Sequence, residues 1–225
     1  MRLFIYQCCP YCSRCRLMAA HKRITLDLSV LAFDDIQAHV DLIGKKILPI
    51  LEYKEGCFMT ETAAICEYLD AFDGKPDVKP VSFNDSWSRL IEDLSRKSKY
   101  LIFPRQIIHP MNHDDFPTQA AKDYCQQKKE VFLQIAFEQA WAKSDDYVSA
   151  IMPMLNKLDS ILTHQYATSD EFSYDDILIF PILRLLTLAA DVLQLPDNMM
   201  SYIQRVSKFS KIALYPECDY SMFTR

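Results

Sequence analysis

Residues 2–12 read Arg2-Leu-Phe-Ile-Tyr-Gln-Cys-Cys-Pro-Tyr-Cys12. A short apolar and aromatic run, typical of a strand, ends in a Cys-Pro-x-Cys motif, and a helical pattern follows at once. Because Pro10 lacks an N–H and has a pre-set φ, it suits the first position of a helix, which makes Cys9 the N-cap. Unpaired backbone N–H groups and the helix dipole favour an anion there, so we expect a Cys9 thiolate with a lowered pKa. Cys12 lies one turn further along, within reach of a mixed disulfide formed at Cys9. The stretch predicts a redox-active dithiol.

Composition and charge narrow the class of protein. The 225 residues suffice for one or two domains, half of them are hydrophobic and 24% are charged, as in soluble globular proteins. The net charge is −5, and no basic stripe or polybasic segment is present, so we expect no nucleic-acid partner and no membrane partner. We see no secretory signal, and the longest apolar run, 177–193, contains a proline and two charged residues. We therefore expect a cytoplasmic protein, in which a C-x-x-C motif indicates redox chemistry or metal binding.

The elements expected after the first helix follow a recognisable order. The patterns predict a strand over 25–30, a short helix capped by Asp34 with Ile36, Val40 and Ile43 on its apolar face, strands over 47–51 and 57–60, and a helix over 62–72. This succession of strand, helix, strand, helix, two strands and helix is the thioredoxin-like arrangement. It is complete by about residue 73, which predicts an α/β thioredoxin-like domain over residues 1–73.

The rest of the chain predicts an all-α C-terminal domain over 83–225, after a polar, proline-bearing linker over 74–82. We expect a first helix that begins at Asn84 or Ser86 and is interrupted near Pro104 and Pro110. Two helices are expected over 118–142 and 145–163, and Pro153 either kinks the second of these or marks its start. A further helix is capped by Ser173 and continues to Leu193, another begins at Pro196, and the tail from Tyr215 is expected to be irregular.

Two dipeptides are further candidates for the site. The Leu48-Pro49 bond could be an ordinary trans bond at a sheet edge, but we favour a cis bond that turns the Leu48 backbone toward a cysteinyl peptide. Glu61-Thr62 could be a simple helix start with Thr62 as the N-cap. Alternatively, Glu61 binds the ammonium of an α-amino acid head group, and Thr62 with the helix N-terminus binds its carboxylate.

Other polar and cysteine-containing positions have plainer interpretations. Cys9, Cys12 and Cys15 follow a C-x2-C-x2-C spacing, but no fourth cysteine follows and their side chains spread around a helix, so we expect no metal. Cys8 and Cys15 are expected to be bystanders. We expect the histidine- and aspartate-bearing segment 109–115 to be a solvated loop and Lys45-Lys46 a solvated turn.

At this point the chain resembles glutathione-transferase-type chains and, within that group, the large two-domain bacterial glutaredoxins of the glutaredoxin 2 family. The stretches that carry the resemblance are 2–16, 44–51, 59–74 with Pro76 after it, and Asp175-Asp-Ile-Leu-Ile-Phe-Pro-Ile-Leu-Arg-Leu-Leu-Thr-Leu188. The resemblance implies reduction of protein disulfides and glutathione mixed disulfides with glutathione as cosubstrate. We also expect a monomer. The residue roles implied are Cys9 as nucleophile, Cys12 as resolving thiol, Tyr11 beside glutathione, Leu48 as a backbone partner before cis-Pro49, and Glu61 with Thr62 at the γ-glutamyl end.

Two other functions fit parts of the sequence. An omega-type glutathione transferase, or monothiol thioltransferase, uses a single active-site cysteine and has no use for Cys12. A non-enzymatic binding module or iron–sulfur carrier would be distinguished by visible absorbance on anaerobic purification.

Overall fold

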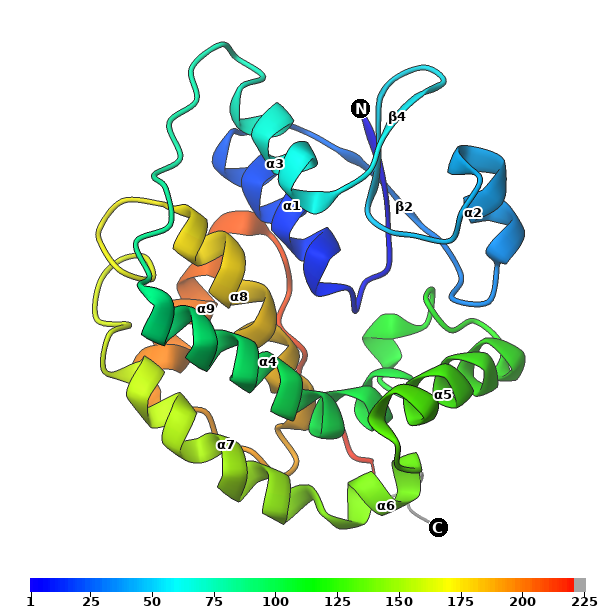
Figure 1. Ribbon diagram of the computed structural model, residues 1–225, viewed down its shortest axis with the longest axis vertical. Coiled ribbons are helices and arrows are strands. Elements are labelled where there is room, and N and C mark those ends of the chain that lie inside the picture. The colour runs from blue at the N-terminus through cyan, green and yellow to red at the C-terminus, as the bar shows by residue number, and fades with distance from the viewer. Residues whose placement is uncertain (221–225) are drawn as a thin grey trace.

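The computed structural model describes residues 1–220. A four-stranded sheet and three helices occupy the first third of the chain, and the described elements from residue 85 onward are all helical (Figure 1). In chain order the elements are β1 (Arg2–Ile5), α1 (Pro10–His21), β2 (Asp27–Val30), α2 (Ile36–Ile43), β3 (Ile50–Lys54), β4 (Cys57–Met59), α3 (Thr62–Asp70), α4 (Asp85–Gln106), the 3-10 helix η1 (Pro110–Asn112), α5 (Gln119–Leu133), α6 (Phe137–Ala142), α7 (Ser144–Asp159), α8 (Tyr174–Leu186), the 3-10 helix η2 (Thr187–Ala189) and α9 (Asp197–Ser210).

The sheet has the strand order β2-β1-β3-β4. β1 pairs in parallel with β2, placing Leu3 opposite Leu28, and antiparallel with β3, placing Leu3 opposite Leu51. β3 and β4 form an antiparallel hairpin. Helices α1 and α3 run side by side against one side of the sheet, and α2 lies on the other side (Figure 1). The predicted thioredoxin-like arrangement is therefore confirmed.

The strand expected over 47–51 begins later than predicted. β3 starts at Ile50, so Pro49 precedes the strand instead of lying within it. A proline has no N–H to donate to a neighbouring strand, and a position just before the first paired residue avoids that loss. Pro49 is thereby placed in the loop that leads into the centre of the sheet.

The predicted apolar face of α2 is wrong. Its N-cap is Asp35, not Asp34, and both Ile36 and Val40 are exposed, whereas His39 is completely buried. His39 can be buried because both ring nitrogens have partners: Nδ1 lies 2.7 Å from the Asp35 carbonyl oxygen, and Nε2 lies 3.0 Å from the Tyr6 hydroxyl. A polar residue, not the apolar stripe, attaches α2 to the body of the protein.

Three helices differ from the predictions. α4 continues through Pro104, because the packing of its buried face outweighs the loss of one backbone hydrogen bond. Pro153 lies inside α7, which excludes only the alternative that it marks the start of that helix. The helix expected over 118–142 is two helices, since Gln134 adopts a left-handed φ of 57° and ends α5. The Glu130 carboxylate accepts a hydrogen bond from the N–H of Phe137 at 2.7 Å, which caps the start of α6. The helix that follows Ser173 ends at Leu186 instead of continuing to Leu193.

One hydrophobic core joins the sheet-bearing and helical parts. Its buried residues include Leu3 and Leu17 from the first part and Leu155 and Phe180 from the second. α1 lies at the centre of this core, because it contacts α3 on one side and α8 and α9 on the other. A second, smaller cluster places Cys8 against apolar residues around α5. Among residues 1–220, no helix combines the length and the apolar character that a membrane span requires.

Candidate active site

Cys9 occupies the N-cap of α1, as the sequence predicts. Its backbone is extended, with φ −82° and ψ 119°, and its Sγ accepts a hydrogen bond from the N–H of Cys12 at 3.3 Å. The hydrogen bond from the Cys12 thiol lowers the pKa of Cys9, and the backbone N–H groups of Cys12 and Tyr11 add to this, although burial opposes it. Cys9 is only partly exposed, at the surface of a cavity. It is therefore a thiol predisposed to ionise where a substrate can reach it.

Cys12 has the opposite electrostatic environment. It is completely buried on the first turn of α1. Burial raises the pKa of Cys12 well above its ordinary value, and the hydrogen bond to Cys9 raises it further. A thiolate at Cys9 and a protonated thiol at Cys12 are the pair of states that nucleophilic attack by Cys9 requires.

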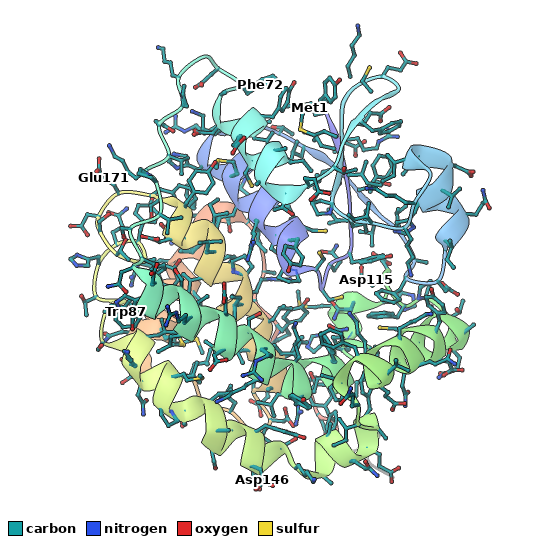
Figure 2. All side chains as sticks on the ribbon, viewed as in Figure 1. Met1, Phe72, Trp87, Asp115, Asp146 and Glu171 are labelled. Atoms are coloured by element: carbon teal, nitrogen blue, oxygen red, sulfur yellow. The ribbon has the colours of Figure 1, made fainter. Side chains whose placement is uncertain are left out.

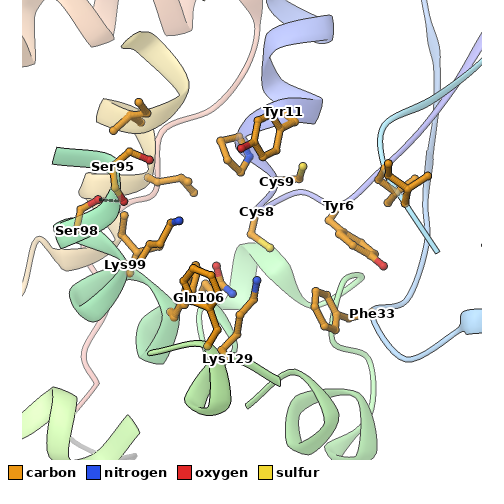
Figure 3. A pocket seen from close by; sticks show the side chains of 18 of the residues that line it. Tyr6, Cys8, Cys9, Tyr11, Phe33, Ser95, Ser98, Lys99, Gln106 and Lys129 are labelled. Atoms are coloured by element: carbon orange, nitrogen blue, oxygen red, sulfur yellow. Dashed lines mark hydrogen bonds between the residues drawn. The ribbon is translucent and has the colours of Figure 1, made fainter. Parts of the chain in front are cut away.

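The cavity beside Cys9 has a volume of about 420 Å³ and lies between the two parts of the chain. Cys9, Tyr11 and Leu48 line it from the sheet-bearing part, and α4, α5 and α8 supply the opposite wall (Figure 3). The Leu48–Pro49 peptide bond is cis, as expected. Pro49, Cys12, Glu61 and Thr62 are not among the residues that line this cavity.

Glu61, not Thr62, is the N-cap of α3. Thr62 is the first residue of the helix, so the prediction that it caps the helix is wrong, and no side-chain hydrogen bond caps this end. Glu61 has a φ of 68° and a ψ of 111°, which is unusual for a residue with a side chain. Such a conformation costs on the order of 1–3 kcal/mol and is found preferentially at functional sites. α3 packs directly against α1, the helix that Cys9 caps.

The helical part holds the loop that precedes Cys9. The two carboxylate oxygens of Asp115 accept hydrogen bonds from the N–H groups of Gln7 at 2.6 Å and Cys8 at 2.9 Å. The carbonyl oxygen of Gln7 accepts hydrogen bonds from the Arg184 guanidinium at 3.1 Å and the Tyr215 hydroxyl at 3.3 Å. Figure 2 shows Asp115 at the junction of the two parts. These contacts fix the backbone immediately before Cys9.

The expectation that segment 109–115 is a solvated loop holds for His113 and Asp114, which are exposed, and is wrong for His109 and Asp115. His109 and Asp115 are both buried, and burial raises the pKa of Asp115 to about 6 against the lowering effect of its two backbone hydrogen bonds. No local pattern could have revealed this role, because the hydrogen-bond donors lie more than a hundred residues earlier in the chain. The expectation for Lys46 is wrong for a similar reason: it is half-buried and donates a hydrogen bond to the carbonyl oxygen of Phe33.

The remaining cysteines near the site are buried thiols. Cys8 lines the cavity, and burial together with the Asp115 carboxylate raises its pKa. Cys15 forms a hydrogen bond with Cys66 of α3, which raises the pKa of Cys15. Cys15, the third cysteine of the C-x2-C-x2-C sequence, therefore faces α3. All eight cysteines are free within residues 1–220.

A thioredoxin-like sheet with a cysteine at the N-cap of α1 and a cis-proline before β3, sharing its core with a bundle of helices, defines a thiol–disulfide oxidoreductase of glutathione-transferase architecture. Residues 8–71 match the family model for the glutathione S-transferase N-terminal domain, and residues 86–218 match the model for the glutaredoxin 2 C-terminal domain. The chain belongs to the glutaredoxin 2 family, and it is an oxidoreductase of the glutaredoxin type.

Individual relatives agree with this assignment. Glutaredoxin 2 of Escherichia coli (strain K12) is 34% identical over 216 residues, which cover 95% of this chain and 97% of the relative. The crystal structure of glutaredoxin 2 from Salmonella typhimurium, in complex with glutathione, matches with a TM-score of 0.88 and 31% identity, covering 95% of this chain and 96% of that one. A glutathione S-transferase of Ceriporiopsis subvermispora shares the fold alone, with a TM-score of 0.71, 15% identity, and coverage of 96% of this chain and 99% of that one.

Proposed function

We propose that this protein reduces protein disulfides and glutathione mixed disulfides by a dithiol mechanism, with Cys9 as nucleophile, Cys12 as resolving thiol and glutathione as reductant. The observation that carries the proposal is the position of Cys9, whose Sγ accepts the N–H of Cys12 at 3.3 Å beside a cavity. Membership of the glutaredoxin 2 family supports the same reaction class.

The proposed chemistry follows from the two pKa values. The Cys9 thiolate attacks one sulfur of the substrate disulfide, the old S–S bond breaks, and the other sulfur leaves as a thiolate. Two routes resolve the intermediate. Cys12, once deprotonated, attacks the Cys9 sulfur and displaces the second half of the substrate, which leaves a Cys9–Cys12 disulfide for glutathione to reduce. When the half bound to Cys9 is glutathione, a second glutathione thiolate attacks its sulfur instead, which yields glutathione disulfide and releases the Cys9 thiolate. Because the pKa of Cys9 is lowered, Cys9 is also a good leaving group in the later steps.

We propose that glutathione binds on the sheet-bearing part. The residues assigned to it are Tyr11, Leu48, cis-Pro49, Glu61 and Thr62. The cis bond before β3 and the unusual backbone of Glu61 at the start of α3 support this assignment. The related Salmonella structure is a complex with glutathione, which supports the same ligand here. No metal takes part in the proposed mechanism.

The proposal extends to the organisation of the chain. We propose a thioredoxin-like domain over 1–73, a linker over 74–82 and a helical domain over 83–225, in a monomer that works in the cytoplasm. The eight free cysteines suit a reducing compartment.

An omega-type, monothiol thioltransferase is the second candidate, because Cys12 is completely buried and its pKa is raised. The variants Cys9→Ser and Cys12→Ser distinguish the two functions when assayed on a glutathione mixed disulfide and on a protein disulfide. Cys9→Ser should lower both activities at least about 1,000-fold, because no other nucleophile is placed at the N-cap. Cys12→Ser should lose protein-disulfide reduction while mixed-disulfide reduction stays within about threefold.

Cys57→Ser is the matched control, since Cys57 lies on β4, does not line the cavity, and should leave both activities unchanged. If Cys12→Ser keeps full activity on protein disulfides, the dithiol mechanism is wrong and the monothiol function replaces it.

A further inference from the structure

The cavity beside Cys9 is positively charged. Three lysines line it, Lys46 before β3, Lys99 on α4 and Lys129 on α5, and none of the other described residues that line it is acidic. The whole chain carries a net charge of −5, so this concentration of positive charge is not a general property of its surface. Figure 3 shows Lys99 and Lys129 extending into the cavity toward the loop of Cys8 and Cys9.

The lysine ammonium groups rest on aromatic rings. The Nζ of Lys99 lies 4.8 Å from the ring centre of Phe132, that of Lys129 lies 4.4 Å from Phe103, and that of Lys46 lies 4.3 Å from Phe33. Within residues 1–220, none of the three lysines forms an ion pair with a carboxylate. A cation–π contact is worth about 0.5–2 kcal/mol and leaves much of the charge uncompensated.

Burial and mutual repulsion make these charges costly. Burial lowers the pKa of Lys99, and the charge of Lys129 lowers it further. Burial is also the main cause that lowers the pKa of Lys46. An anionic group that entered the cavity would relieve this repulsion, so the cavity is complementary to negative charge.

The cavity is also apolar and continues onto the surface. Phe132 lines it and is 61% exposed, so a ligand that covers this ring must extend to the solvent-facing edge of the cavity on α5. A volume of about 420 Å³ admits a few residues around a cysteine but no folded domain. An extended peptide segment can occupy the cavity and still reach the exposed ring of Phe132.

This inference rests on the proposed function. We propose that Lys99 and Lys129, on the cavity wall formed by α4 and α5, select the protein half of the mixed disulfide. The preferred protein half is an extended segment in which acidic and apolar residues flank the cysteine. The Cys9 thiolate attacks the glutathione sulfur of the mixed disulfide, an S–S bond forms between Cys9 and glutathione, and the bond to the peptide breaks. The electron pair leaves with the peptide sulfur, beside the lysines. A second glutathione thiolate then attacks the Cys9-bound glutathione, which yields glutathione disulfide and regenerates the Cys9 thiolate.

The test compares three glutathionylated peptides of equal length whose cysteine is flanked by Asp and Phe, by Ser and Phe, or by Lys and Phe. At low ionic strength the wild-type kcat/KM should be at least about tenfold higher for the acidic peptide than for the basic one, and the ratio should shrink as salt is added. The double variant Lys99→Gln/Lys129→Gln should lose most of this ratio.

The matched control is Lys97→Gln/Lys122→Gln, which removes the same charge from α4 and α5 at positions outside the cavity and should keep the preference. The proposal is overturned if the wild type shows no preference for the acidic peptide, or if the cavity variant keeps it. A mixed disulfide of glutathione with a small aromatic thiol acid that is turned over as fast as the acidic peptide would also overturn it, in favour of a small-molecule site.

A second measurement separates this proposal from the proposed function. Calorimetric titration with the acidic and basic peptides, each with Ser in place of Cys, reports charge selectivity without turnover. Selective binding of the acidic peptide together with no turnover of any mixed disulfide would refute the oxidoreductase mechanism alone. Turnover of all peptides with equal binding would refute the specificity alone.

Discussion

Two thiols three residues apart have opposite acid–base properties in this protein. Cys9 and Cys12 share one helical turn, yet the pKa of Cys9 is lowered and that of Cys12 is raised. The difference arises because the Cys9 sulfur receives hydrogen bonds at the open end of α1, whereas the Cys12 sulfur is enclosed in the core. Position relative to the helix N-terminus, not the identity of the residue, decides which of the two thiols is the more acidic.

Selective alkylation tests this at the residue scale. Burial raises the pKa of Cys8 and Cys12, and the hydrogen bond with Cys66 raises that of Cys15. We therefore expect iodoacetamide at about pH 6 to modify Cys9 first among the eight cysteines. The ultraviolet thiolate absorbance should titrate with a pKa below the free value of about 8.5, and Cys9→Ser should remove this transition. A Cys9 pKa at or above that value would contradict the arrangement at the N-cap.

At the scale of elements, the start of α8 is held by hydrogen bonds from several distant segments. Ser173 and Asp176 form a capping box, and the Asp176 carboxylate also accepts hydrogen bonds from the N–H of Ala167 at 2.8 Å and the hydroxyl of Tyr202 at 2.9 Å. The preceding Asp175 accepts the N–H of Ser82 at 3.0 Å. These bonds attach the segment after α3 and helix α9 to the same turn.

Two substitutions should separate capping from the wider network. Ser173→Ala should lower the free energy of unfolding by about 1 kcal/mol, the usual cost of losing an N-cap. Asp176→Ala should cost more than about 2 kcal/mol, because it leaves several buried donors without an acceptor. Urea denaturation measures both, with Ser86→Ala at the exposed first turn of α4 as the control, expected within about 0.5 kcal/mol. Equal costs for Ser173→Ala and Asp176→Ala would contradict the network.

At the scale of the whole molecule, the helical part positions the active-site loop across the junction. Asp115 holds the N–H groups of Gln7 and Cys8, and Arg184 and Tyr215 hold the carbonyl oxygen of Gln7. A redox motif formed by local sequence is therefore anchored by three side chains from distant segments.

The pH dependence of stability tests this anchor. The folded protein raises the pKa of Asp115 from 3.8 to about 6, so between these values the native state binds more protons than the unfolded state. The contribution of Asp115 to the free energy of unfolding should therefore be greatest below about pH 4. This contribution should fall by up to about 3 kcal/mol as the pH rises through 6. Subtracting the unfolding free energy of Asp115→Asn from that of the wild type should isolate this decline. Parallel pH profiles for the two proteins would show that Asp115 is not the titrating group.

The predictions from sequence succeeded where the decisive interactions are local. The strand followed by Cys-Pro-x-Cys and the capping residues of α8 depend on neighbours in the chain, and each is present. The cis bond before Pro49, which was expected from the thioredoxin-like arrangement, is also present. They failed where a distant partner decides. Asp115 and Lys46 were expected in solvent, but Asp115 is buried and Lys46 is half-buried, each against residues that only folding brings near.

By itself, then, the sequence determined the fold class, the order of the sheet elements and the cysteine at the opening of α1, because strand pattern, proline and helix end act over a few residues. Only the tertiary structure decided that a buried carboxylate anchors the loop before Cys9 and that lysines from α4 and α5 line the cavity next to it. Contacts between segments a hundred residues apart produce no periodic pattern in the sequence. Only the folded structure reveals them.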